Sequence, residues 1–513
     1  MLISNERIAE SILEALDRIR RRGDIAADVA YDLMVAATML RHAQHVDTSD
    51  GQDVRRFGRE SAHLLRAMRD SELMSGAERA PLREELAAVA GAADSLATST
   101  LGGNALKRAL MVFLKRMEQG FAEMATLVPH AAASLFARFT SDLLRNHNGI
   151  ELTTKAVAAE PDSSAGEPLT EANLTEYFRQ KLSDRTAVAT KVVTLTGGFC
   201  KQTSLFTLTS QTLHGDLVMR RDNAVNLYEG LDCHAGANEY PLLRAVYSRG
   251  FPVPEPVLFE PGTRVINGPA FTIMRRVPGA VSGDATGGSS PVPADLQRVL
   301  AQLTARLHTL EPLTQLREIP AFEPSLWRKS ATECTRLYIA SWFRHYRENA
   351  HLPAPPLYGL FNWLLAHVPV TDEKPVLVHG DIGFHNLLFD RGKLSGMLDW
   401  EFAHTGDPAE DLGYIRSVMG SQLDWGAFIA DYAAATQRSA PSEARVRFFE
   451  IWAHTRNAAA SALMVDHFEV GRSRNIKNGI VMYHFMPHYM ARTEALIDDF
   501  NRRSCDAVGR GTC

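Results

Sequence analysis

Cysteine is scarce in this chain: there are 5 in 513 residues, scattered and without CxxC spacing. An odd, scattered set supports neither a disulfide framework nor a zinc site, and it is typical of a reducing compartment. Long apolar runs are also missing, since no stretch reaches about 18 uninterrupted apolar residues. Charged Glu6, Arg7 and Glu10 stand where a signal peptide needs its apolar segment. We therefore expect a cytoplasmic protein that does not cross a membrane.

Positive charge is not in excess either. Lys and Arg number 55 against 60 Asp and Glu, which gives a formal net charge of −5. The basic surplus that holds a polyanion non-specifically is missing, so nucleic acid is not an expected partner. Apolar residues make up 45% and charged residues 22%, which is ordinary globular usage and excludes wholesale disorder. At about 100–200 residues per domain, this length predicts two or three domains.

The pattern of apolar and polar residues changes near residue 170, from one typical of helices to one typical of strands. Residues 1–155 show apolar side chains at i, i+4 spacing and Ala-rich runs, which predict an all-α bundle to which we assign no chemistry. The bundle offers a surface for a homodimer. Residues 156–171 concentrate Ala, Pro, Ser, Gly and acid without periodicity and indicate a linker. We expect an N-terminal lobe at 172–278, a helical lobe at 279–500 and a tail at 501–513.

Short β-rich runs with turn signals fill the first of these lobes and predict an antiparallel sheet. A helical segment around 238–247 interrupts them. In chain order, the β-rich runs are 192–199, 204–210, 216–222, 252–260 and 268–277.

The most informative segment is a β-like insertion at residues 374–402. An apolar strand leads into Asp381, and a hairpin follows that turns at Asp390–Lys393, with Asn386 at its entry and Asp399 at its exit. Each of these three residues alone is most often a turn or cap residue. Together they place one carboxylate for a hydroxyl proton and two oxygen ligands for Mg²⁺. The combination predicts phosphoryl transfer.

Two sequences around these residues, HGDIGFHN (379–386) and LDWEFAHTGDPAEDLGY (398–414), resemble the two signatures of the aminoglycoside phosphotransferase and choline kinase-like family. The resemblance covers roughly residues 170–500. It implies an α+β, protein-kinase-like fold in which a small antiparallel β lobe and a larger helical lobe enclose a cleft for ATP and Mg²⁺.

The resemblance also implies roles for single residues in the helical lobe. By position, Asp381 is the catalytic base, and Asn386 and Asp399 hold the magnesium. Asp411 is the buried acid that braces the catalytic loop. A pseudokinase commonly lacks one of the first three residues, so their presence favours an enzyme over a non-catalytic nucleotide-binding module.

For the nucleotide, the resemblance points to the β lobe. Gly197, Gly198 and Phe199 lie where the first β-rich run ends and the chain turns toward the next, and backbone N–H groups there can approach phosphates. This turn lacks the GxGxxG pattern, and no APE sequence follows Asp399, which disfavours a protein kinase.

A cation and a hinge complete the implied nucleotide site. Arg220 stands in the third strand where the family has a phosphate-binding lysine, and Glu239 in the following helix would pair with it. The backbone near Met274 would contact adenine.

The acceptor stays open among several small molecules that carry a hydroxyl. Residues 398–414 resemble most the kinase-like half of acyl-CoA dehydrogenase fusion proteins, which implies a hydroxyacyl-CoA. An aminoglycoside, choline or a sugar are the alternatives, although the helices expected at 425–500 are mixed and partly basic rather than strongly acidic. Basic residues there that could meet CoA phosphates are Arg456, Arg472, Arg474 and Lys477.

Overall fold

A computed structural model of the chain comprises two compact units. The first contains Met1–Lys155, Tyr346–His367 and His454–Cys513, and the second contains Ala156–His345 and Val368–Ala453. The residues that the structure describes are 52–70, 77, 80–101, most of 105–117, 169–195, 201–222, 234–263, 265–281, 290–350, 354–469 and part of 489–500. The domain boundaries expected from the sequence stay a prediction, because most of the expected linker and the tail lie outside these residues.

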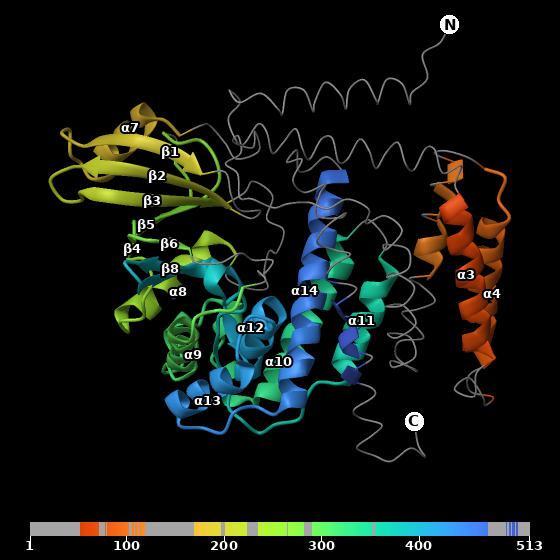
Figure 1. Cartoon of the computed structure of the whole chain (residues 1–513). Coiled ribbons are helices and arrows are strands. Elements are labelled where there is room, and N and C mark those ends of the chain that lie inside the picture. Colours follow the sequence, from red (N-terminus) through yellow and green to blue (C-terminus); the bar gives the residue numbers. More distant parts are fainter. Residues whose placement is uncertain are drawn as a thin grey trace, which may run out of the picture. The chain divides into compact units, whose positions relative to one another are not determined.

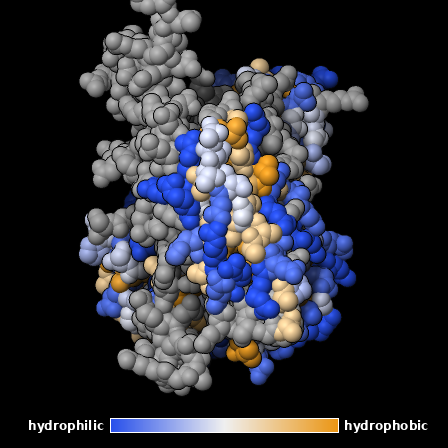
Figure 2. Space-filling model, turned by 90° about the vertical axis from the view of Figure 1, so that its right-hand side faces the viewer, coloured by the Kyte–Doolittle hydropathy of each residue, from blue (hydrophilic) through white to orange (hydrophobic). Residues whose placement is uncertain are grey.

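In the first unit, α3 (Gln52–Arg69) and α4 (Ala80–Ala97) pack against each other around a small apolar core. They approach closely at Gly58, where a Cβ atom would stand 2.7 Å from the backbone nitrogen of Ala97. Figure 2 shows hydrophilic side chains with small apolar areas between them on the described part of one face of the molecule. Helix α11 (Pro355–Ala366) also belongs to this unit. An all-α domain over residues 1–155 stays a prediction, since much of that range lies outside the described residues.

In the second unit, five antiparallel strands form one sheet in the order β1-β2-β3-β5-β4 (Figure 1). The strands are β1 (Val188–Leu195), β2 (Lys201–Thr209), β3 (Gly215–Asp222), β4 (Pro256–Glu260) and β5 (Phe271–Arg275). The predicted antiparallel sheet is therefore confirmed. Pairing of Thr203 with Arg220, and of Val218 with Met274, sets these four side chains on one face of the sheet.

Helix α7 (Glu171–Lys181) packs on the opposite face and is an element that the sequence analysis does not predict. It begins with a capping box, in which the Thr170 hydroxyl accepts from the Asn173 backbone N–H and the Asn173 side chain accepts from the Thr170 backbone N–H. Leu174 and Phe178, one turn apart, are buried against the strands. This helix closes the core of the β lobe on the face opposite to the one that carries Arg220.

The remainder of the second unit is mainly helical, with α8 (Gly236–Ser248) placed between β3 and β4 as predicted. The further long helices are α9 (Ala294–His308), α10 (Ala331–Asn349), α12 (Pro408–Met419), α13 (Trp425–Thr436) and α14 (Glu443–Glu469), of which α10 and α14 extend into the first unit. Short 3₁₀ helices lie at Thr314–Leu316, Pro320–Phe322, Leu326–Arg328, Phe384–Asn386 and Trp400–Phe402. In the part of the chain that the structure describes, every helix is too short or too polar to span a bilayer.

The predicted hairpin is confirmed and sits among these helices. Strands β8 (Leu387–Asp390) and β9 (Lys393–Met397) pair antiparallel, and β6 (Ala280–Val281) pairs with β8. Strand β7 (Val376–Val378) pairs with β10 (His404–Gly406). Strand β7 ends directly before the loop that carries Asp381, and β9 ends two residues before Asp399. The second unit thus has the small antiparallel lobe followed by a larger helical lobe that the resemblance implies, while the bounds 172–500 stay a prediction.

Candidate functional site

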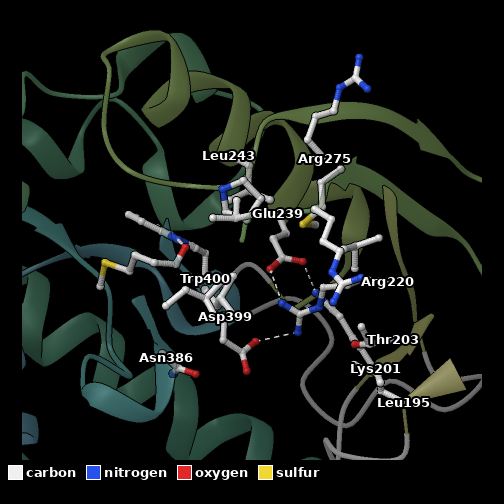
Figure 3. Close-up of a pocket in the computed structure, with 18 of the residues that line it drawn as sticks. Leu195, Lys201, Thr203, Arg220, Glu239, Leu243, Arg275, Asn386, Asp399 and Trp400 are labelled. Atoms are coloured by element: carbon white, nitrogen blue, oxygen red, sulfur yellow. Dashed lines mark hydrogen bonds and ion pairs between the residues drawn. The ribbon is translucent and has the colours of Figure 1, made fainter. Parts of the chain in front are cut away.

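A cleft of about 400 Å³ lies against the open face of the sheet. One part of its lining comes from β2, β3, β5 and α8, and the other comes from the hairpin and the residues that follow it (Figure 3). Predicted site residues that line the cleft are Arg220, Glu239, Met274, Asn386 and Asp399. Residues far apart in the sequence therefore meet in one place. Gly197, Gly198 and Phe199 lie outside the described residues.

Asp381 adjoins the cleft through its bonds to Asn386. Its Oδ2 accepts a hydrogen bond from Asn386 Nδ2 at 2.8 Å, and its Oδ1 accepts one from the Tyr414 hydroxyl and lies 3.3 Å from His385 Nε2. Burial alone would raise the pKa of Asp381, but His385 and Tyr414 hold that pKa well below its usual value. The carboxylate is therefore ionised, and three side chains fix its orientation.

Asp411, in α12, accepts hydrogen bonds from the backbone of the loop that carries Asp381. Its Oδ1 accepts the Gly380 N–H at 2.8 Å, and its Oδ2 accepts the His379 N–H at 3.0 Å and lies 3.0 Å from His308 Nε2. Gly380 has a φ of +81°, a conformation that a residue with a side chain rarely adopts. Burial would raise the pKa of Asp411, but the bonds from His308 and the loop lower it. Asp411 thus stands where the resemblance implied.

Asn386 and Asp399 bring two oxygen donors to the cleft. The segments that carry them are joined, since the Leu398 N–H donates to the Asn386 carbonyl at 2.8 Å. Asp399 itself has a left-handed backbone (φ 64°, ψ 63°), which is typical of residues held in place for a function. A third of its side chain is exposed. Loss of hydration in the cleft raises the pKa of Asp399 to about 6, against the opposing effect of Arg220.

Two cations share the carboxylate of Glu239. Arg220 Nη1 lies 3.3 Å from Glu239 Oε1, which is the predicted pair, and Arg220 Nη2 donates to Asp399 Oδ1 at 2.7 Å (Figure 3). Lys201 Nζ lies 2.5 Å from Glu239 Oε2, and both side chains are almost completely buried. Burial would lower the pKa of Lys201, but Glu239 raises it above its usual value. The Lys201–Glu239 pair is therefore charged on both sides.

Glu401 adds a third carboxylate to the cleft. It is buried, and one of its oxygens lies 3.8 Å from His234 Nδ1. Burial would raise the pKa of Glu401, but His234 and the nearby cations Lys201 and Arg220 lower it. Glu401 is therefore also ionised.

Two further residues that the sequence analysis names, Met274 and Arg456, are both buried, but only Met274 lines the cleft. Met274, in β5, is buried and lines the cleft, while the contact of its backbone with adenine stays a prediction. Arg456, in α14, is 1% exposed, so it does not present a cation at the surface for a CoA phosphate. Arg472, Arg474 and Lys477 lie outside the described residues.

Among the residues of this site that the sequence analysis does not single out are Lys201, Glu401, His385 and Tyr414. Lys201, Thr203 and Leu205 are every second residue of β2 and lie on its cleft face. The two-residue period of a strand could therefore have placed Lys201 in the cleft. His385 and Tyr414 lie inside the two signature segments, but nothing in the spacing alone shows that they meet at Asp381.

Comparison with known proteins adds independent findings. The model of a family described as phosphotransferase enzyme family matches residues 192–449. Acyl-CoA dehydrogenase family member 11 of Gallus gallus is 32% identical over 187 residues, which are 36% of this chain and 23% of that protein. Viomycin phosphotransferase of Streptomyces vinaceus is 28% identical over 179 residues, which are 34% of this chain and 58% of that protein.

Among solved structures, spectinomycin phosphotransferase in complex with ADP and spectinomycin is similar over 64% of this chain and 100% of that chain, with 11% identity and a TM-score of 0.41. The chain spans less than a quarter of the length of the acyl-CoA dehydrogenase family member that it matches.

Proposed function

The chain belongs to the phosphotransferase enzyme family, and from that premise we propose that it transfers the γ-phosphate of ATP to a hydroxyl group of a small molecule. The observation that carries this proposal is the meeting of Asp381, Asn386 and Asp399 beside one cleft. A loose phosphoryl-transfer transition state asks the protein for alignment and charge stabilisation, and these three residues supply both.

The donor set at Asn386 and Asp399 fits Mg²⁺. The nitrogen of the Asn386 side chain is used in two hydrogen bonds to Asp381, which leaves its oxygen for a ligand. Arg220 binds one oxygen of Asp399, and Figure 3 shows the other turned away from it. Mg²⁺ usually takes one or two protein oxygens and completes its shell with phosphates and water. A bound Mg²⁺ would supply neutralisation of phosphate charge.

The side chains of the chain itself then have separate tasks. Asp381 accepts a hydrogen bond from the acceptor hydroxyl and aligns its oxygen with the γ-phosphorus. As the new O–P bond forms and the bond to ADP breaks, the hydroxyl proton passes to Asp381. The low pKa of Asp381 keeps its carboxylate ionised at neutral pH, so its oxygens can accept the hydrogen bond from the acceptor hydroxyl. Asp411 keeps the loop of Asp381 in place.

For the acceptor, we favour a hydroxyacyl-CoA. The 32% identity with an acyl-CoA dehydrogenase family member supports this choice, together with the likeness of residues 398–414 to the kinase-like half of such proteins. Antibiotic phosphorylation is the second candidate, supported by the 28% identity with viomycin phosphotransferase over more than half of that enzyme.

The test is ADP release from ATP and Mg²⁺ with a panel of hydroxyacyl-CoAs, viomycin, aminoglycosides, choline and sugars, each product being identified by mass spectrometry. We expect the wild type to phosphorylate one class of these compounds and the Asp381→Asn variant to phosphorylate none of them. Nucleotide binding without transfer to any hydroxyl would favour a non-catalytic module. Phosphorylation of viomycin but of no acyl-CoA would favour the second candidate.

A further inference from the structure

The charges around Glu239 are unusual because two cations meet one carboxylate. Lys201 Nζ binds Oε2 at 2.5 Å and Arg220 Nη1 binds Oε1 at 3.3 Å. Burying a charge costs free energy that pairing only partly recovers. Asp399 binds Arg220 and Glu401 lies near both cations, so both cations are balanced by carboxylates, and their geometry decides which of them can meet a phosphate.

Each of the two terminal nitrogens of the Arg220 guanidinium already binds a carboxylate oxygen. Its shorter contact, 2.7 Å, is to Asp399, so the side chain bridges a helix of the β lobe to the segment after β9. A planar group with donors in a fixed fork suits such a bridge between two carboxylates, whereas a lysine presents a single point charge. A phosphate that approached Arg220 would also meet the carboxylates of Glu239 and Asp399, which are bound to the same guanidinium.

Lys201 has donors to spare. An ammonium group has three N–H donors, and within the described part of the chain Nζ binds one carboxylate oxygen. Lys201 is also the first residue of β2, directly after the Gly-containing turn at 196–200 that the sequence predicts to approach phosphates. Its side chain lines the cleft on the same face as Thr203.

We propose that Lys201, and not Arg220, is the residue that binds the phosphates of the nucleotide, while Arg220 holds Glu239 and Asp399 together. This inference rests on the proposed function, because it names a further binding residue of the same cleft. It also explains how the third strand can carry Arg where a lysine was expected: the ammonium group comes from the neighbouring strand.

The first experiment measures affinity for ADP and adenosine by calorimetry with EDTA present, so that effects through the metal are absent. Lys201→Met should weaken ADP binding by about 10- to 100-fold, since a charge-assisted hydrogen bond is lost, and leave adenosine binding unchanged. The matched variant, Arg220→Met, should weaken ADP binding less than Lys201→Met does, because Arg220 holds Glu239 and Asp399 and does not bind the phosphates in this proposal. A larger loss for Arg220→Met than for Lys201→Met would overturn the inference.

A rescue variant uses the register of the sheet. In Lys201→Met/Arg220→Lys, the ammonium moves to β3, two residues along the cleft face from its original level. We expect this double variant to recover part of the ADP affinity that Lys201→Met loses. A double variant that binds ADP no better than Lys201→Met would count against phosphate binding by a lysine in this cleft.

The second experiment keeps the wild-type protein and so does not depend on a variant that folds. The probe is an acyl phosphate derivative of ATP. The ammonium of a lysine near the phosphates first loses a proton to water. Its amine then attacks the acyl carbonyl, an amide bond forms with loss of a second proton, the bond from the carbonyl carbon to phosphate oxygen breaks, and ATP leaves. Peptide mass spectrometry should find the label on Lys201, and excess ATP should prevent it.

The outcomes separate this inference from the proposed function. If the wild type binds ATP but Lys201 is unlabelled and Lys201→Met binds ADP normally, the inference is wrong and the proposed function stands. If the wild type binds no ATP, ADP or probe, the proposed function fails and the inference fails with it.

Discussion

Replacing Asp411 by Asn should separate two roles of a single buried carboxylate. All three partners of Asp411 present nitrogen to it: the N–H groups of His379 and Gly380, and Nε2 of His308. A carboxylate accepts at both oxygens, but an amide offers one oxygen and one NH₂ group. In either amide orientation, an N–H donor of the loop or of His308 then faces another donor.

The magnitude follows from those contacts. Leaving a buried donor without an acceptor costs about 1–3 kcal/mol, and the lost charge assistance adds to it, so we expect Asp411→Asn to lower the free energy of unfolding by about 2–4 kcal/mol. Because the loop carries Asp381 two residues after His379, kcat should fall by at least about tenfold, the equivalent of about 1.4 kcal/mol. Affinity for ADP should change little, since Lys201 and Met274 are not touched.

Asp407→Asn is the matched control for this prediction. Asp407 is also buried, caps the same helix α12 through the Ala409 N–H and pairs with Arg445, and the hydrogen bonds that the structure describes for its side chain go to these residues and not to the loop. It should lower stability similarly in urea unfolding and leave kcat within about twofold. The reasoning is refuted if Asp411→Asn keeps its kcat, or if Asp407→Asn loses kcat to the same extent.

The sequence predicts the strand ends of the site well. Polar residues that follow short apolar runs lie where strands stop, which is why the local pattern already places Asp381, Asn386 and Asp399 near one another. Five antiparallel strands and α8 also follow from local patterns and turn signals. In all these cases the information lies within a few residues along the chain.

Contacts between distant segments could not be predicted in the same way. Arg220 and Asp399 are far apart in sequence, and only the packing of the β lobe against the hairpin brings them to 2.7 Å. Lys201 looks like an ordinary strand residue until Glu239 is placed opposite it. Helix α7 could not be predicted for another reason. Its capping box at Thr170 directly follows an acidic, Pro-containing segment, and the composition of that segment indicates a linker.

Three further predictions concern the chemistry. Asp381→Asn should abolish phosphoryl transfer and leave ATP affinity nearly intact; turnover within about tenfold of the wild type would remove Asp381 from the base role. Asp399→Ala should remove Mg²⁺-dependent nucleotide binding, and unchanged Mg·ATP affinity in calorimetry would contradict it. The last concerns pH. The folded state lowers the pKa of Asp411, so its stabilising effect is complete above its ordinary pKa of about 4 and is lost as the pH falls through the lower folded-state value. Urea unfolding from pH 7 to pH 2 should therefore show a smaller loss of stability in acid for Asp411→Asn than for the wild type. Equal losses in both proteins would mean that the carboxylate is not stabilised by its three partners.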